Sequence, residues 1–174
     1  RIIAEMVARI DSLNQMVQDL LVFARPAPPT RAPVSIGRLV TETVELLGTD
    51  PEMRGVTVDV SGASPTLTAD AGLMKGVLLN LMINAAQAIA RRGRIGVSIA
   101  EVDGRCEVRV ADTGPGIPPE IREKVFEPFF TTKHRGTGLG LSVARRTVEL
   151  HGGRISIESP PEGGTVMVVT LPLA

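Results

Sequence analysis

A proline-rich segment near the start of the sequence sets the firmest limit on how this chain can fold. Four prolines lie close together there, at Pro26, Pro28, Pro29 and Pro33. Each proline fixes its own φ angle and biases the preceding residue away from the helical region, so a helix cannot continue through them. We therefore expect a short, stiff linker over 26–33 that separates one structural unit from the next.

The residues before this linker predict one long amphipathic helix over 1–25. Apolar side chains recur there in alternating steps of three and four, the spacing of a coiled-coil seam, at Ile3, Met6, Ile10, Leu13, Val17, Leu20 and Ala24. Val7 and Leu21 widen the apolar stripe, which suits a four-helix bundle. Two interpretations stay open. The helix packs against a second copy in a homodimer, which we favour, or it folds back on its own domain.

The sequence after the linker alternates between the periods of helices and strands. The spacing predicts helices over 37–48, 70–90, 118–125 and 138–151, and strands near 56–60, 66–69, 95–101, 106–111, 154–159 and 165–171. Asp103-Gly104 predicts a tight hairpin between two of these strands. These blocks indicate an α+β domain over 34–174, a two-layer sandwich of helices on a mixed, mostly antiparallel sheet.

Composition narrows the range of functions. Of the 174 residues, 43% are hydrophobic and 22% charged, as in a globular domain. The 19 basic and 19 acidic side chains balance, which argues against a nucleic-acid partner and against contact with an acidic membrane surface. Unbroken apolar runs are far shorter than the roughly 20 residues of a membrane span. The single cysteine, Cys106, excludes an internal disulfide and favours a cytoplasmic location.

Two amide side chains interrupt the apolar helix predicted over 70–90. Asn80 and Asn84 stand four residues apart and so share one helix face, with Gln87 one turn further on. Burying an amide without a partner costs about 1 to 3 kcal/mol, so the pair needs an explanation. Each amide caps a neighbouring loop, or their oxygens bind a hard cation such as Mg²⁺.

Two glycine-rich segments follow. Asp112–Ile117 comes directly after a predicted strand, where a carboxylate can accept a hydrogen bond from a ligand amino group. A plain turn containing an aspartate explains this segment equally well. Gly136–Ser142 opens a helix, and the N–H groups of a helix N-terminus can bind phosphate. Neither segment has the glycine spacing of the two commonest nucleotide-binding folds, which are therefore excluded.

Taken in order, these motifs resemble the ATP-binding catalytic domain of sensor histidine kinases. The matching segments are Asn80 with Asn84, Asp112–Ile117, Phe126–Lys133 and Gly136–Leu141, which resemble the family's N box, first glycine box, phenylalanine box and second glycine box. The likeness covers about 34–172 and includes Gly163-Gly164-Thr165. It implies the Bergerat-type fold of the GHKL superfamily. It also implies that the helix over 1–25 is the second helix of a dimerisation and phosphotransfer domain.

The resemblance assigns roles around a bound nucleotide. It implies that Asp112 accepts the adenine amino group, with Thr165 supporting it through water, and that Asn84, with Asn80, holds Mg²⁺ on the phosphates of ATP. The glycines of the first box let the loop lie along the nucleotide, at Gly114 and Gly116. Backbone amides of the second box reach the phosphates, at Gly136, Thr137, Gly138, Leu139 and Gly140.

The same likeness implies a mobile lid over about 127–137. Phe129 and Phe130 are expected to anchor its start, and Lys133 is expected to contact a phosphate. Many histidine kinases carry a lysine where Gln87 stands, so that contact is expected to come from Arg91 or Lys133 instead.

The implied reaction is transfer of the γ-phosphoryl group of Mg–ATP to a histidine of a dimerisation domain, for relay to a response regulator receiver domain. Related ATPases and anti-sigma serine kinases carry a glutamate at the position of Asn80 that activates water, so transfer is expected rather than hydrolysis. His134 and His151 lie outside any acceptor motif. The chain starts at Arg1, not Met, so we expect the acceptor upstream, and ATP binding without autophosphorylation. The alternatives are a nucleotide-binding pseudokinase and a gyrase-type ATPase or serine kinase.

Overall fold

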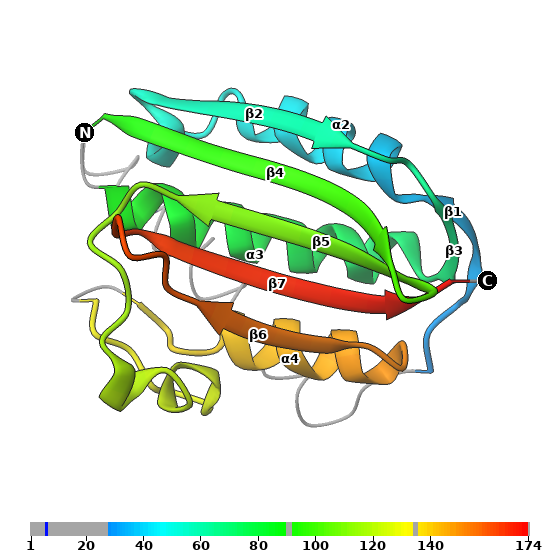
Figure 1. The fold of residues 1–174 in the computed structure, drawn as a ribbon. Helices are drawn as coiled ribbons and strands as arrows, with labels where there is room; N and C mark the ends of the chain where they lie inside the picture. Colours follow the sequence, from blue (N-terminus) through cyan, green and yellow to red (C-terminus); the bar gives the residue numbers. More distant parts are fainter. Residues whose placement is uncertain (1–5, 7–27, 90–91, 134–135, 174) are drawn as a thin grey trace.

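In the part of the chain that the structure describes, one five-stranded sheet and three helices form the body of the domain (Figure 1). The computed structural model describes residues 6, 28–89, 92–133 and 136–173. In sheet order the strands are β2 (Val56–Gly62), β4 (Gly93–Val102), β5 (Arg105–Asp112), β7 (Thr165–Pro172) and β6 (Arg154–Glu158). β2 runs parallel to β4 and all other pairs are antiparallel. The predicted α+β sandwich with a mixed, mostly antiparallel sheet is confirmed, whereas the helix predicted over 1–25 lies outside the described residues.

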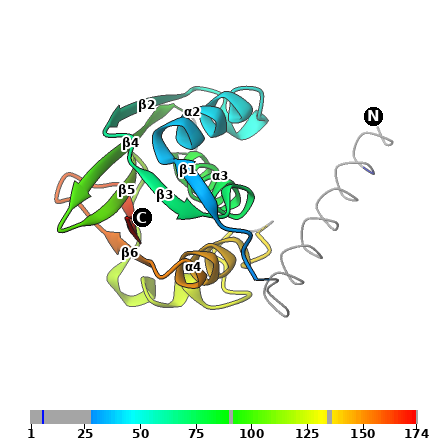
Figure 2. The same cartoon turned by 90° about the vertical axis from the view of Figure 1, so that its right-hand side faces the viewer.

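The helices cover one face of the sheet as a second layer (Figure 2). They are α2 (Ile36–Leu47), α3 (Ala71–Ile89) and α4 (Gly140–Leu150). α3 lies between the other two and packs on both, as well as on β4 and β5. By length and composition alone α3 is long and apolar enough to cross a membrane, which the short unbroken apolar runs did not indicate. In the fold it is the central helix of the core.

The core between the two layers is built from aliphatic side chains. Alternate strand residues face the helices and are buried, among them Ile95, Val97 and Ile99 of β4 and Cys106, Val108 and Val110 of β5. α3 contributes Met74, Val77, Leu78, Leu81, Met82, Ala85, Ala86 and Ile89. Burial of a large aliphatic side chain contributes about 1.5 to 3 kcal/mol. Because the chain has no Trp or Tyr, these aliphatic side chains supply most of the stability of the core.

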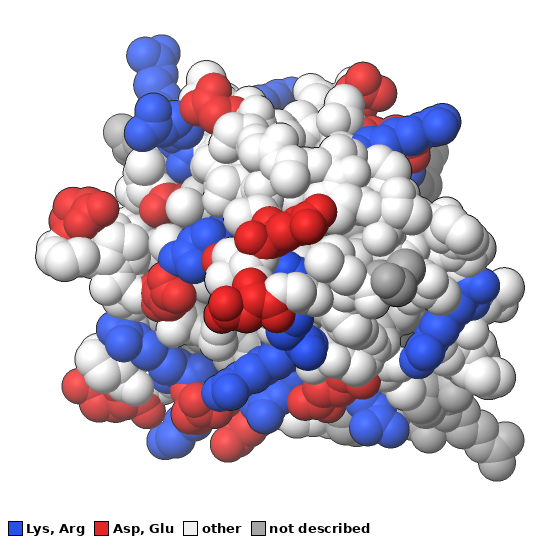
Figure 3. All heavy atoms as spheres, turned by 45° about the vertical axis from the view of Figure 1, so that its right-hand side comes forward, with Lys and Arg blue, Asp and Glu red and all other residues white. Residues whose placement is uncertain are grey.

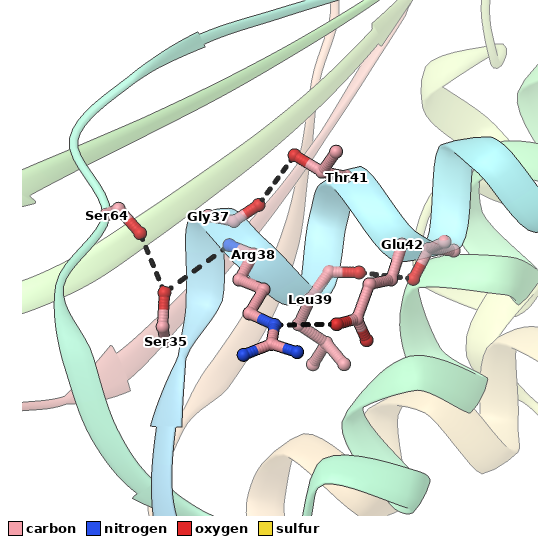
Figure 4. A network of polar contacts seen from close by, with 8 residues as sticks. Ser35, Gly37, Arg38, Leu39, Thr41, Glu42 and Ser64 are labelled. Carbon is pink, nitrogen blue, oxygen red and sulfur yellow. Dashed lines mark hydrogen bonds and ion pairs between the residues drawn. The ribbon is translucent and has the colours of Figure 1, made fainter.

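A small second sheet precedes α2. β1 (Ala32–Ser35) pairs antiparallel with β3 (Thr66–Ala69), a pairing that sequence periodicity did not predict. The Ser35 hydroxyl accepts from Arg38 N at 3.4 Å as the cap of α2, and lies 2.9 Å from the Ser64 hydroxyl (Figure 4). This network joins the start of α2 to the loop between β2 and β3.

Two predicted helices differ from the structure. The helix expected over 118–125 is instead two short 3₁₀ turns, η2 (Pro119–Ile121) and η3 (Lys124–Phe126). Prolines supply no N–H donor, and the turns close through i→i+3 bonds such as Ile121 N to the Pro118 carbonyl at 3.1 Å. The helix expected from residue 138 starts later, because Gly138 has φ of 69° and cannot be part of a right-handed helix.

Candidate functional site

Asp112 is the last residue of β5 and its side chain lies on the helix side of the sheet, because it pairs with the buried Ile95. Its Oδ1 accepts hydrogen bonds from Gly114 N at 2.8 Å and from Thr165 N at 3.3 Å. Burial raises the pKa of this carboxyl, against the opposing effect of hydrogen bonds from the backbone of Gly114 and from the backbone and side chain of Thr165.

Glycines close the backbone around Asp112. Gly164 has φ of 84°, and a Cβ there would lie 2.1 Å from the carbonyl oxygen of Asp112. A Cβ on Gly114 would lie 2.8 Å from Asp112 Oδ1 and 3.1 Å from the Ala88 Cβ of α3. The segment predicted as a glycine loop is thus packed tightly between the sheet and α3, which goes beyond what a plain turn requires.

Asn80 and Asn84 lie half-buried on the face of α3 that meets these loops. A Cβ added to Gly140, the first residue of α4, would lie 2.8 Å from Asn80 Oδ1. Asn84 Oδ1 accepts a hydrogen bond from Lys133 Nζ at 2.7 Å. Asn84 therefore does contact a neighbouring loop, as the interpretation of the amides as loop caps requires. The group that it contacts there is the ammonium of Lys133.

The second glycine segment forms the N-terminus of α4. Leu139 is fully buried, and its N–H donates to Thr137 Oγ1 at 3.2 Å. The first turn of α4 carries no acidic residue, so its N–H groups present an unopposed partial positive charge. Phe129 N donates to the Gly138 carbonyl at 2.9 Å, which joins this loop to the phenylalanine segment.

The phenylalanine segment is anchored by a residue other than the two expected. Phe129 is 64% exposed and has φ of 67°, and Phe130 is only half-buried. Phe126 is buried instead, with the Arg145 guanidinium 5.5 Å from its ring centroid. The expectation that Phe129 anchors the segment is wrong, because its left-handed backbone turns the side chain outward while Phe126 fills the space beside α4.

Lys133 joins this segment to α3. Its ammonium donates to Asn84 Oδ1 and also to Gln87 Oε1. Although the side chain as a whole is exposed, burial around its ammonium lowers the pKa of Lys133, against the attraction of the Glu52 carboxylate. Sequence reasoning assigned no role to Gln87 beyond its departure from the family pattern, and no local pattern connects residues so far apart in the chain.

The donor set suits only certain cations. In residues 28–89, 92–133 and 136–173 no three His, Cys, Asp or Glu side chains gather as a metal site. The amide oxygens of Asn80 and Asn84 are hard, uncharged ligands. Such ligands fit a Mg²⁺ ion that takes its remaining coordination from phosphates and water. Arg91, the other cation expected near the phosphates, and His134 fall outside the described residues.

His151 follows α4 and is buried at 4% exposure. Its Nδ1 lies 2.7 Å from the Thr147 carbonyl oxygen and therefore donates to it, while Nε2 accepts from Asp70 N at 3.0 Å. Both ring nitrogens are engaged and covered, which agrees with the expectation that His151 is not a phosphoacceptor.

Two hollows border the site from outside. One of about 390 Å³ lies beside the C-terminal turn of α3 and is lined by Glu52, Ala86 and Gln87 among others. The other, of about 500 Å³, is lined by Asp112, Gly114 and Gly164 among others, and extends over the opposite face of the sheet, where Gly96 and Ala111 point. Acidic and basic residues are interspersed on the face of the molecule in Figure 3.

Comparison with known proteins agrees with this geometry. The sequence model of the family described as histidine kinase-, DNA gyrase B-, and HSP90-like ATPase matches residues 69–174. The chain belongs to this family. The chain is 40% identical to the sensor histidine kinase ZraS of Klebsiella oxytoca, over 97% of this chain and 37% of that protein. It is 38% identical to the histidine-protein kinase AtoS of Escherichia coli, over 94% of this chain and 28% of that protein.

Solved structures place the chain within that family. It superposes on full-length ShkA in complex with AMPPNP with TM-score 0.83 and 33% identity, over 94% of this chain and 36% of that one. The catalytic domain of histidine kinase ThkA gives 0.75 and 32%, over 82% and 95%. ThkA in complex with response regulator TrrA gives 0.81 and 28%, over 99% and 50%. The described domain is the ATP-binding catalytic domain of a sensor histidine kinase. The chain spans less than two fifths of the length of the two curated relatives named above.

Proposed function

We propose that this domain transfers the γ-phosphoryl group of Mg–ATP to a histidine on a dimerisation domain. The observation that carries the proposal is the order of contacts along one face of α3. Asn80 meets the first residue of α4, Ala88 meets the loop after Asp112, and Asn84 lies between them. These positions are spaced i, i+4 and i+8, so they span about 12 Å along the helix. That length suits a nucleotide lying on α3 with its base at Ala88 and its phosphates at Asn80.

Each end of that face offers the matching chemistry. At the base end, the Asp112 carboxylate accepts the adenine amino group, with Thr165 supporting through water and Gly114 and Gly116 allowing close approach. At the phosphate end, Asn84 and Asn80 hold Mg²⁺ and Lys133 contacts a phosphate. The backbone amides that reach the phosphates belong to Gly136, Thr137, Gly138, Leu139 and Gly140.

The reaction asks little covalent chemistry of this domain. Mg²⁺ would neutralise charge on the phosphate oxygens. An imidazole nitrogen forms the new N–P bond with its own lone pair while the bond between the γ-phosphorus and the β,γ-bridging oxygen breaks, and ADP leaves. Positioning and charge neutralisation therefore suffice. An amide at Asn80 cannot take a proton from water, which favours transfer to a protein group over hydrolysis.

In the whole protein, we infer a homodimer formed through the helix over 1–25. The linker over 26–33 would join that helix to this catalytic domain over 34–174. Its product would pass to a response regulator, as the structure of ThkA with TrrA supports for a protein of this kind. The catalytic domain would work on the cytoplasmic side.

The test supplies a dimerisation domain bearing the acceptor histidine together with this domain and γ-labelled ATP. We expect acid-labile label on the histidine of the added domain and none with Asp112→Asn. Nucleotide binding without label would instead indicate a pseudokinase. Release of phosphate, or acid-stable label on a serine, would indicate the ATPase or serine-kinase alternative. Asn80→Glu is expected to gain hydrolysis, and a variant that does not would undercut the role given to Asn80.

A further inference from the structure

The Lys133–Gln87 contact is not explained by the reaction itself. The residues around Lys133 are exposed, including Thr131, Thr132 and Gly136. Its ammonium nevertheless reaches across to α3 and donates to two amide oxygens one turn apart, on Asn84 and Gln87. These bonds join parts of the chain 49 and 46 residues apart.

The chemistry of the three groups fixes their orientation. An ammonium has three donors and no acceptor, so both amides must turn their oxygens toward it. A glutamine at 87 serves this purpose, whereas a lysine there would repel Lys133. The residue that departs from the family pattern therefore creates an acceptor for a cation carried by another segment.

The same Asn84 oxygen is the one proposed to bind Mg²⁺. An ammonium and a divalent cation on one oxygen repel each other strongly at such short range. Mg²⁺ can therefore bind the Asn84 oxygen only when phosphates attract the ammonium away from it. Phosphate oxygens are the stronger partner, because they are charged and amide oxygens are neutral.

We infer that Lys133 is a two-position latch whose resting place is built by Gln87. Without nucleotide, Lys133 occupies the Asn84 oxygen and is held there by Gln87. Mg–nucleotide displaces it from Asn84 toward the phosphates. Gln87 is thus a positioning residue that keeps Lys133 beside the site. The Lys133 ammonium then competes with Mg–nucleotide for the Asn84 oxygen. This inference rests on the proposed role of Asn84.

The first measurement is amide hydrogen exchange without nucleotide, in wild type, Gln87→Leu, Lys133→Met and the double variant. Three amides report on the segment because they are bonded within it or to the loop before α4: Phe129 N to Gly138, Phe130 N to Glu127, and Gly136 N to Lys133. We expect roughly 3- to 10-fold faster exchange at these amides in both single variants and no further rise in the double variant. Unchanged exchange in Gln87→Leu would overturn the latch.

The second measurement is Mg–nucleotide affinity, by titration of a fluorescent ATP analogue. Because a latched fraction lowers apparent affinity, Gln87→Leu is expected to bind roughly 2- to 5-fold more tightly in the wild-type background. It is expected to change nothing when Lys133 is already methionine. Lys124→Met, which removes an exposed lysine of η3, is the matched control for lost charge.

The outcomes separate the two proposals. Equal effects of Gln87→Leu with and without Lys133 would overturn the latch while leaving the nucleotide site intact. Wild-type protein that binds no nucleotide while its exchange pattern still responds to Gln87→Leu would overturn the site and the displacement step together, leaving a purely structural contact.

Discussion

The two ends of the candidate nucleotide site are held by contacts of different kinds. At the base end, Asp112 accepts from the backbone N–H groups of Gly114, in the loop directly after β5, and of Thr165, which pairs with Asp112 in the register of β5 and β7. At the phosphate end, Lys133 and Asn84 meet through the tip of a long side chain on an exposed loop. A backbone contact within a sheet cannot change partner without unpairing strands, whereas an ammonium can rotate to a new acceptor.

This difference matches what each end has to do during turnover. The adenine is the same group before and after phosphoryl transfer, so a rigid acceptor serves throughout. The γ-phosphate leaves, so the contacts around it must change within each cycle. We therefore expect substitutions at the base end to act as all-or-none losses, and those at the phosphate end to act as graded shifts.

The sharpest comparison is between two glycines, one at each end. A Cβ at Gly164 would meet the Asp112 carbonyl oxygen at 2.1 Å with φ of 84°, and neither can relax. At Gly136 it would meet the Thr131 hydroxyl at 2.4 Å, which accepts from Lys133 N at 3.0 Å and so can move at the cost of one exposed hydrogen bond. Gly164→Ala is expected to lower the free energy of unfolding by about 3 kcal/mol or more, and Gly136→Ala by about 1 kcal/mol. Urea unfolding measures both, and equal losses would break the comparison.

Asp112→Asn tests the base end by affinity. It replaces a carboxylate oxygen with an NH₂ that would face the adenine amino group donor to donor, so we expect roughly 10- to 100-fold weaker nucleotide binding, about 1.5 to 3 kcal/mol. Titration of a fluorescent ATP analogue measures it against a dark background, since the chain has no Trp or Tyr. Glu107→Gln removes a charge from the opposite face of the same strand and is expected to bind normally.

Binding should also depend on pH through this carboxyl. Because burial raises the pKa of Asp112, it protonates at a higher pH than an ordinary aspartate. Only the ionised form leaves both oxygens free to accept, so wild-type affinity is expected to fall on acidification before ordinary carboxyls titrate. A matching fall in Asp112→Asn would assign the effect to another group.

The base end is also the part that sequence reasoning described well. Its signals are local: a strand with a period of two, an aspartate at its end and glycines directly after it. The same holds for α3, which follows the helical period of its sequence and is capped by Asp70, whose Oδ1 accepts from Leu73 N at 3.0 Å. Local patterns succeed there because the residues that interact are neighbours in the chain or share one helix face.

Contacts between distant segments were out of reach for the same reason. No periodicity in 32–35 reveals that it pairs with Thr66–Ala69 as β1 and β3. Phe126 and Phe129 look alike in sequence, and only the left-handed backbone of Phe129 decides which one is buried. The pairing of Lys133 with Gln87 depends on how the loop crosses α3, which no local pattern predicts. The one signal in the sequence was that Gln87 stands where many histidine kinases have a lysine.

Asp70 joins the start of α3 to the end of α4, away from the candidate nucleotide site. Asp70 caps α3, accepts Thr30 N at 2.8 Å through Oδ2, and its own N–H donates to His151. Asp70→Ala is expected to cost about 1 kcal/mol of stability and to leave nucleotide affinity unchanged. An accompanying loss of affinity would show that neither end of the site is independent of this scaffold.

The same residue makes the stability of the fold depend on pH. The Leu73 N–H bond lowers the pKa of Asp70 below its unfolded value. Its contribution is therefore complete above the unfolded pKa and is lost as pH falls through the folded one. Asp70→Asn keeps a cap oxygen but does not titrate, so thermal unfolding of this variant should lose less stability between neutral and acidic pH than wild type.

The smallest expected effect tests how firmly the phosphate end is joined to α4. Arg145→Gln removes the cation over Phe126 and the bond from Arg145 Nε to Glu149 at 3.1 Å, whereas Glu149→Gln removes only the ion pair. The difference between the two variants should be about 0.5 kcal/mol, as for an exposed cation–π contact. Exchange at the Phe129 amide should rise slightly and affinity should hardly change. If Arg145→Gln weakened binding as much as Asp112→Asn, the phosphate end would depend on a fixed frame like that of the base end, and the contrast between a rigid and an adaptable end would fail.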